Sequence, residues 1–206
     1  IHVEKPDQEA VPSRQFDISK IDFELLSREF AHTRRKNLLL RNLDELVNQQ
    51  LAKMLFANPQ RIDYYDRYQE IIDAYNAEQN RATIEKTFMD LMELASSLDT
   101  EQQRYVREGF SSDEELSVYD LLFSENLTKQ EIETIKKVSV DLLTKIKQQI
   151  AKLDHWTDKQ ETKAIVDNLI RNTLWQELPN SYDVSDIQTY QKKIYEYVYM
   201  RYPEVA

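Results

Sequence analysis

Residues 128–153 of this chain read TKQEIETIKKVSVDLLTKIKQQIAKL, and this stretch decides the fold. Its apolar residues recur at intervals of mostly three or four, which places them on one stripe of an α-helix. They are Ile132, Ile135, Val138, Leu142, Leu143, Ile146, Ile150 and Leu153. Thr128 and Glu131 have the spacing of a capping box, so the helix is expected to begin at Thr128. At about 1.5 Å per residue it would be a rod of about 37 Å, and other helices must cover its apolar stripe.

The composition of the chain favours an all-α protein. Its 206 residues include one glycine and five prolines, and 31% of them are charged. Folds rich in β-strands need many more glycines in their turns. The hydrophobic content of 41% is enough for one domain with a sizeable core. We therefore predict an all-α fold, an irregular multi-helix bundle of about 7–9 helices around a long central helix at about residues 128–153.

Apolar stripes with helical spacing run through most of the remaining chain. They predict helices over residues 16–30, 42–57, 63–75, 84–98, 112–123, 157–178 and 185–198, and a short helix that ends at Gly109. The segments 63–75 and 84–98 could form one bent helix, but the polar stretch between them favours two. Asn58-Pro59 is expected to end the second helix, because proline disfavours α geometry in the residue before it.

Several polar residues are expected to mark where helices begin and end. Three further pairs repeat the capping-box spacing: Ser112 with Glu115, Thr157 with Gln160, and Ser185 with Gln188. Asp22 and Asp99 are expected to cap two more helices. Gly109 is the one glycine of the chain, and we expect it to take the left-handed conformation just after the short helix.

Residues 1–15 differ from the rest of the chain. They contain Pro6 and Pro12 and show no helical stripe, so we interpret them as a polar linker before a single helical domain at residues 16–206. The chain begins with Ile1 rather than Met, and we expect it to be a segment of a larger protein. No apolar run approaches the roughly 18 residues of a transmembrane helix, and the start lacks a signal-peptide pattern. We therefore expect no membrane contact and a cytoplasmic location, with which the absence of cysteine agrees.

The residues needed for the common kinds of catalysis are missing or scattered. One glycine is too few for a phosphate-binding loop. The three histidines, at positions 2, 32 and 155, lack the helical spacing of a zinc site, and no cysteine can act as a nucleophile. Acids such as Asp63 and Asp66 recur at helical spacing and fit a solvated face better than an active site. The sequence therefore predicts a module with no catalytic residue, no metal and no cofactor of its own.

Two groups of cations are candidate contacts for DNA phosphates. The first lies in the acid-free stretch 31–42 and consists of Arg34, Arg35, Lys36 and Arg41, for which an exposed loop between helices is the alternative. The second consists of Lys136, Lys137, Lys147, Lys159 and Lys163, on or just after the helix at 128–153. It could form a continuous basic ridge, and the alternative is a solvated outer face. Because the net charge is −10, DNA contact would need such a local patch and would be weak and non-specific.

The chain has twelve tyrosines, many for its length, and they crowd toward its end. Between residues 195 and 202 they occur on every side of the predicted helix, so one core cannot bury them all. Tyrosine suits partner interfaces because it joins an apolar ring to a polar hydroxyl. The candidates for a partner interface are Tyr190, Tyr195, Tyr199 and Tyr202, with packing against a neighbouring helix as the alternative. Trp156 and Trp175 are expected to be core or corner residues.

Several short motifs, taken in order along the chain, resemble one known family. The first are residues 16–23 (FDISKIDF), 36–38 (KNL), 58–59 (NP) and 61–65 (RIDYY). They continue with residues 68–72 (YQEII), 75–76 (YN), 119–122 (YDLL), 136–138 (KKV), 159–160 (KQ) with Thr162, and 194–199 (IYEYVY). Together they resemble the helical C-terminal region of the R (motor) subunit of type I restriction-modification enzymes. The likeness runs from about Phe16 to Pro203, nearly the whole chain.

The resemblance implies a larger parent, a type I site-specific endodeoxyribonuclease that translocates DNA with ATP before cutting it. The nuclease and motor domains, with their ATP and Mg²⁺, would lie upstream of Ile1, and no catalytic residue can be transferred to the matched region. R subunits of this family join methyltransferase and specificity subunits in one complex of the bacterial cytoplasm. The expected roles are therefore docking onto that core and an accessory contact with double-stranded DNA. The alternative is a stand-alone helical module for protein–protein interaction with no DNA contact.

Overall fold

The structure of the chain, a computed structural model, describes residues 21–78 and 80–203. Within these ranges it contains nine α-helices, one short 3-10 helix and no strand, which confirms the predicted all-α fold. The elements are α1 (Phe23–His32), α2 (Lys36–Ala57), η2 (Pro59–Arg61), α3 (Ile62–Ala77), α4 (Arg81–Gln102), α5 (Arg104–Arg107), α6 (Asp113–Leu122), α7 (Lys129–Ile150), α8 (Gln160–Glu177) and α9 (Val184–Arg201). The predicted linker at residues 1–15 and residues 16–20 of the first predicted helix lie outside the described residues.

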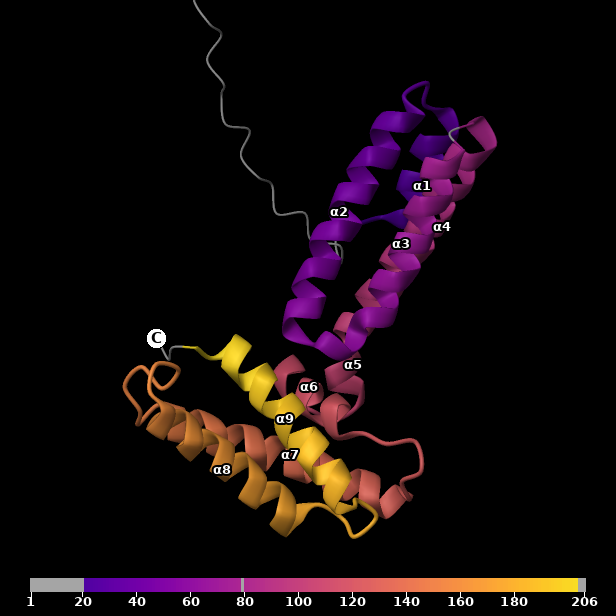
Figure 1. Ribbon diagram of the computed structural model, residues 1–206. Coiled ribbons are helices and arrows are strands. Elements are labelled where there is room, and N and C mark those ends of the chain that lie inside the picture. The colour runs from indigo at the N-terminus through magenta and orange to yellow at the C-terminus, as the bar shows by residue number, and fades with distance from the viewer. Residues whose placement is uncertain (1–20, 79, 204–206) are drawn as a thin grey trace, which may run out of the picture.

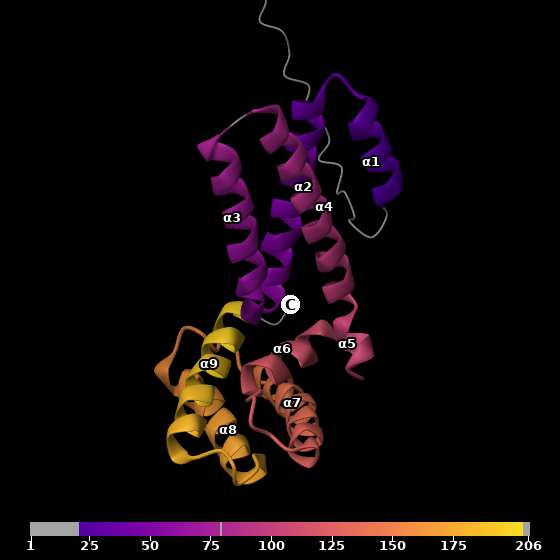
Figure 2. The same ribbon diagram turned by 90° about the vertical axis from the view of Figure 1, so that its right-hand side faces the viewer.

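The helices form two bundles that meet near α5 and α6 (Figure 1). Helices α1–α4 make the first bundle, and α6–α9 make the second. Each bundle has its own cluster of buried hydrophobic residues, between residues 30 and 98 in the first and between 110 and 198 in the second. The two bodies stay distinct when the molecule is turned by 90° (Figure 2). The core therefore has two parts, each with a long helix at its centre.

Helix α4 is the centre of the first bundle, because α2 and α3 both pack along it. The apolar residues of α4 follow helical spacing, and Phe88, Leu91 and Leu98 are completely buried. Phe30 of α1 stacks on Phe88 with 3.6 Å between the ring centroids, which attaches α1 to this core. The polar stretch before Arg81 separates α3 from α4, so the prediction of two helices rather than one bent helix is confirmed.

Helix α7 is the centre of the second bundle, and it is the helix predicted from the stretch 128–153. Ile135, Leu142 and Ile146 are completely buried on it, and α6 and α8 pack against it. The predicted capping box is present. The Thr128 hydroxyl accepts a hydrogen bond from the backbone amide of Glu131, and the Glu131 carboxylate accepts one from the backbone amide of Thr128.

Two other predicted caps are confirmed, and so is the special role of the glycine. Asp22 caps α1 by accepting a hydrogen bond from the amide of Leu25. Ser112 caps α6 in the same way through the amide of Glu115. Gly109 follows the short helix α5 with a φ of 84°, the left-handed region that a side chain would strain.

Three predicted helix starts are wrong. Asp99 lies inside α4, whose hydrogen bonding continues to Gln102. Thr157 caps nothing, because its hydroxyl donates to the carbonyl of Pro203, and α8 begins at Gln160 with no side-chain cap. The last helix begins at Val184 rather than after Ser185, because Asp183 and Asp186 form the capping box there. Aspartate is as good an N-cap as serine, so the spacing of Asp183 and Asp186 also predicts a helix start there.

Replacing Leu142 with alanine should lower the free energy of unfolding by about 2–5 kcal/mol, because its side chain is completely buried beside the other apolar residues of α7. The exposed Met200 of α9 provides the control in the same bundle, and Met200→Ala should change the free energy by less than about 0.5 kcal/mol. Urea denaturation followed by tryptophan fluorescence measures both changes, because Trp156 is buried in the same core as Leu142. Equal effects of the two substitutions would contradict the assignment of the core.

The Thr128→Ala substitution removes the acceptor for the amide of Glu131 and should cost about 1 kcal/mol of stability. Thr144 is an exposed threonine of the same helix whose hydroxyl only bonds back to the carbonyl of Val140. Thr144→Ala should therefore be close to neutral. Thermal unfolding followed by circular dichroism compares the two variants, and a Thr144→Ala loss as large as that of Thr128→Ala would argue against the capping role.

Candidate interaction surfaces

Arg61 lies in η2, where the two bundles meet, and its side chain is only 3% exposed. Its Nε donates to the Glu101 carboxylate at the end of α4 over 3.0 Å, and its Nη2 donates to the Asp113 carboxylate at the start of α6 over 2.7 Å. Burial acts to lower the pKa of Arg61, but the hydrogen bonds and charges of Asp113 and Glu101 outweigh it and raise that pKa. The guanidinium therefore remains charged and links α4 to α6.

A second set of polar contacts surrounds Asp120 of α6. Arg104 of α5 donates two hydrogen bonds to its carboxylate, of 2.5 and 3.0 Å, and Asn58 donates a third of 2.7 Å from the end of α2. Burial raises the pKa of Asp120 in spite of these donors. Ser117 of α6 donates over 2.9 Å to the carbonyl of Ala57, which adds a further contact between the bundles.

We call this group the polar joint. Its members are Asn58, Arg61, Glu101, Arg104, Asp113, Ser117 and Asp120. Sequence reasoning missed it, because the partners are separated by up to 62 positions and no local spacing connects them. The only local signal was the Asn58-Pro59 turn, which brings Asn58 and Arg61 to the end of the first bundle.

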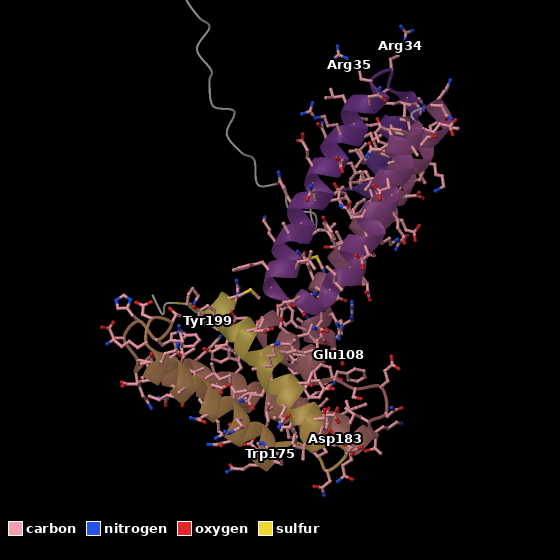
Figure 3. All side chains as sticks on the ribbon, viewed as in Figure 1. Arg34, Arg35, Glu108, Trp175, Asp183 and Tyr199 are labelled. Carbon is pink, nitrogen blue, oxygen red and sulfur yellow. The ribbon has the colours of Figure 1, made fainter. Side chains whose placement is uncertain are left out.

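The first predicted group of cations lies at the end of the first bundle that is remote from the polar joint. Arg34 and Arg35 are exposed in the turn between α1 and α2 (Figure 3). Lys36 begins α2, earlier than predicted, and its Nζ lies 2.6 Å from the Glu85 carboxylate. Arg41 is exposed but pairs with Glu45 over 3.1 Å. Two of the four cations are thus neutralised by acids, and Arg34 and Arg35 remain as the local positive charge.

The second predicted group lies on the second bundle, and acids interrupt it. The Nζ of Lys136 donates to the backbone carbonyl and the carboxylate of Glu108, over 3.0 and 3.2 Å. Lys147 pairs with Glu114, whose pKa is lowered because Lys147 and Arg201 outweigh the opposing effect of burial. The other members, Lys137, Lys159 and Lys163, are exposed or half-buried, and the Nζ of Lys163 lies 5.8 Å from the ring centroid of Tyr199.

The two cation groups therefore belong to different bundles and do not form one surface. Arg34 and Arg35 are at one end of the molecule, and Glu108, the partner of Lys136, lies near the polar joint (Figure 3). The role of all nine cations in DNA contact stays a prediction.

The predicted interface tyrosines mostly build the second core. Tyr190, Tyr195 and Tyr202 are partly buried against it. The ring of Tyr195 meets Trp156 edge-on at 6.2 Å, and Tyr199 does so at 5.7 Å. Tyr199 is the exposed member of the four, at 38%. The alternative, packing against a neighbouring helix, therefore describes Tyr190, Tyr195 and Tyr202. A partner contact stays a prediction, and it fits the exposed Tyr199 best.

The two tryptophans differ from each other. Trp156 is 1% exposed, as expected of a core residue, and its indole N–H donates over 2.6 Å to the carbonyl of Tyr202. Trp175 is 49% exposed in the last turn of α8 (Figure 3), so a place in the core is wrong for it, and the corner before α9 is the part of the prediction that fits. The buried residues of α8 include Val166, Ile170 and Leu174. Trp175 follows Ile170 by five positions, about 140° around the helix, so its side chain faces away from the core.

Trp175 belongs to a surface that we call the α8 outer face. Its members are Ala164, Ile165, Asn168, Asn172 and Trp175, which recur at helical spacing and are all exposed. The buried residues of α8, such as Val166 and Ile170, lie on the opposite side, against α7 and α9. None of the five is charged, but two exposed charged residues adjoin them, Glu161 in the first turn of the same face and Arg171 at its edge. An exposed aromatic residue beside polar and charged ones is typical of protein–protein interfaces, which have an apolar centre and a polar rim.

Across residues 21–78 and 80–203, no three His, Cys, Asp or Glu side chains gather in a way that could hold a metal ion. Two cavities of about 480 and 290 Å³ border the polar joint, and Arg61 lines both. A third, of about 320 Å³, lies among α2, α3 and α4. In the same ranges, no helix is long and apolar enough to cross a membrane.

A family model matches residues 9–202, and its description is "Type I restriction enzyme HindI endonuclease subunit-like, C-terminal". Neither a curated protein nor a solved structure matched the chain. The match covers nearly all of the sequence, and it confirms the resemblance found from the ordered motifs. The chain therefore belongs to the family of C-terminal domains of type I restriction enzyme HindI endonuclease subunit-like proteins.

Proposed function

We propose that this chain is a non-catalytic assembly domain, which docks the endonuclease (R) subunit of a type I restriction enzyme onto the methyltransferase and specificity subunits. The family supports the context of a restriction enzyme. The parent would act in the bacterial cytoplasm, and its nuclease and ATP-driven motor, with ATP and Mg²⁺, would lie in other parts of the protein. In this proposal the chain contributes surfaces and no reacting group.

The observation that carries the docking proposal is the α8 outer face. Trp175 is half-exposed at one end of it, and Ile165 is 42% exposed near the other. Between them Asn168 and Asn172 offer hydrogen bonds without a charge to desolvate. Burying this face against a partner would remove two large apolar side chains from water. Tryptophan is also among the residues that contribute most to binding energy in interfaces.

A second role, an accessory contact with double-stranded DNA, is favoured by one observation. Arg34 and Arg35 are exposed and adjacent, and no acid pairs with either of them within the described residues. Two guanidinium groups at a tip can contact phosphates without reading the sequence. Such a contact would be weak and sensitive to salt, because the chain as a whole has a net charge of −10. A stand-alone interaction module with no DNA contact is the alternative that the tests below distinguish.

Trp175→Ala in the full-length R subunit should weaken its association with the methyltransferase–specificity core by roughly 30-fold, equal to about 2 kcal/mol, because truncation removes the aromatic anchor of the α8 outer face. Met89→Ala is the matched control, since Met89 is 56% exposed on α4 and lies outside that face. Mass photometry or gel filtration of the mixed subunits measures the assembly. Unchanged assembly of a folded Trp175→Ala variant would exclude docking through this face.

The double substitution Arg34→Ala, Arg35→Ala should reduce the slope of log K against log salt for DNA binding by the assembled enzyme by about 1.8, the value for two phosphate contacts. Arg28→Ala with Arg67→Ala is the control of equal charge, because these arginines are paired with Glu24 and Glu93 on the same bundle. Filter binding or fluorescence anisotropy at several salt concentrations gives the slope. A slope that both pairs leave unchanged would favour the module without DNA contact.

A further inference from the structure

The chain passes from the first bundle to the second once within the described residues. The passage runs through residues 103–112, which contain only the single turn of α5 and the left-handed Gly109. All of α1–α4 precede it, and all of α6–α9 follow it. A short passage with one turn of helix allows two bodies to change their relative orientation without unfolding either.

Several hydrogen bonds and an ion pair cross this boundary. Arg61 to Asp113, Asn58 to Asp120 and Ser117 to the carbonyl of Ala57 each join one bundle to the other. The two clusters of buried hydrophobic residues have no member in common. Separating the bundles would therefore expose charged and polar groups to water and leave both apolar cores covered.

Such a boundary can hold the bundles in one orientation and still allow them to separate. The two Nη atoms of Arg61 donate hydrogen bonds to the two carboxylate oxygens of Asp113 over 2.9 and 2.7 Å, and this paired geometry fixes direction as well as distance. Ions that separate regain their hydration, which offsets much of the attraction that is lost. The two cavities that Arg61 lines bring solvent-accessible space to the joint, on surfaces that include Val106 in one case and Phe123 in the other.

We propose that residues 103–112 form a hinge about which the two bundles move as rigid bodies, and that the contacts of the polar joint hold the bundles in one relative orientation. When the contacts of Arg61 are closed, the bundles have one orientation. When they open, the α1–α4 bundle swings about residues 103–112 while α6–α9 keep their structure. A further contact also joins the bundles: the Arg201 guanidinium of α9 lies 4.7 Å from the ring centroid of Phe56 in α2.

The chain suits a direct test, because it contains no cysteine to interfere with labelling. Cysteines introduced at the exposed positions Asn42 of α2 and Gln148 of α7 place one spin label on each bundle. Pulsed electron paramagnetic resonance then gives the distribution of distances between them. We expect one narrow distribution with the native joint, and a distribution at least twice as wide in Arg61→Gln. Arg67→Gln is the matched control, because it removes an ion pair between α3 and α4 inside the first bundle.

An Arg61→Gln distribution as narrow as that of Arg67→Gln would overturn the proposal. Circular dichroism and tryptophan fluorescence guard against a variant that fails to fold, since both tryptophans belong to the second bundle. If Arg61→Gln loses its helices, Asp113→Asn provides the second measurement. Loss of helix content and of the native tryptophan signal in both variants would also overturn the proposal, because the bundles would then depend on the joint for folding.

Discussion

Arg61 carries a charge that it cannot lose, and it lies almost out of contact with water between two helix bundles. An unpaired charge in that place would cost several kcal/mol, so two carboxylates must meet it. Glu101 comes from the end of α4 and Asp113 from the start of α6. This requirement brings the end of the first bundle to the beginning of the second. We propose that this ion and its partners, with the contacts of Asn58, Ser117 and Arg201, hold the orientation of the two bundles, whereas the shape of each bundle follows from its own apolar core.

Much of each bundle could be predicted from the sequence, because helices are local. The stripe from Ile132 to Leu153 and the Thr128–Glu131 box predicted the start of α7 correctly and placed its end three residues beyond Ile150, since both depend on neighbours within one or two turns. Errors arose where two local signals competed. Asp183 and Ser185 both preceded an apolar stripe, and aspartate in fact caps α9. The division of the core could not be predicted, because it depends on which stripes meet, and periodicity does not record that.

The candidate site was less predictable for the same reason. A lysine on a helix reads the same in sequence whether its Nζ faces water or a carboxylate from another helix. Lys136 and Lys147 meet Glu108 and Glu114, which lie 28 and 33 positions away, so the expected basic ridge is interrupted by contacts that no local pattern reveals. Trp175 is exposed because it lies about 140° around α8 from Ile170, on the side opposite the buried stripe. Which side of α8 faces the core depends on the helices that pack against it, α7 and α9, and periodicity alone does not give that.

The positions of the two candidate surfaces give the polar joint its significance. Arg34 and Arg35 are at the end of the first bundle that is remote from the joint, and Trp175 is on the second bundle (Figure 3). Each surface is held by its own core, so neither can move relative to its bundle without the loss of buried apolar contacts. In the hinge proposal, the distance between the surfaces is set by the polar joint and by the contact of Arg201 with Phe56. A shared apolar core would have fixed that distance permanently, whereas ion pairs fix it only while they remain closed. If the proposal holds, a change at these few side chains alters the arrangement of both bundles.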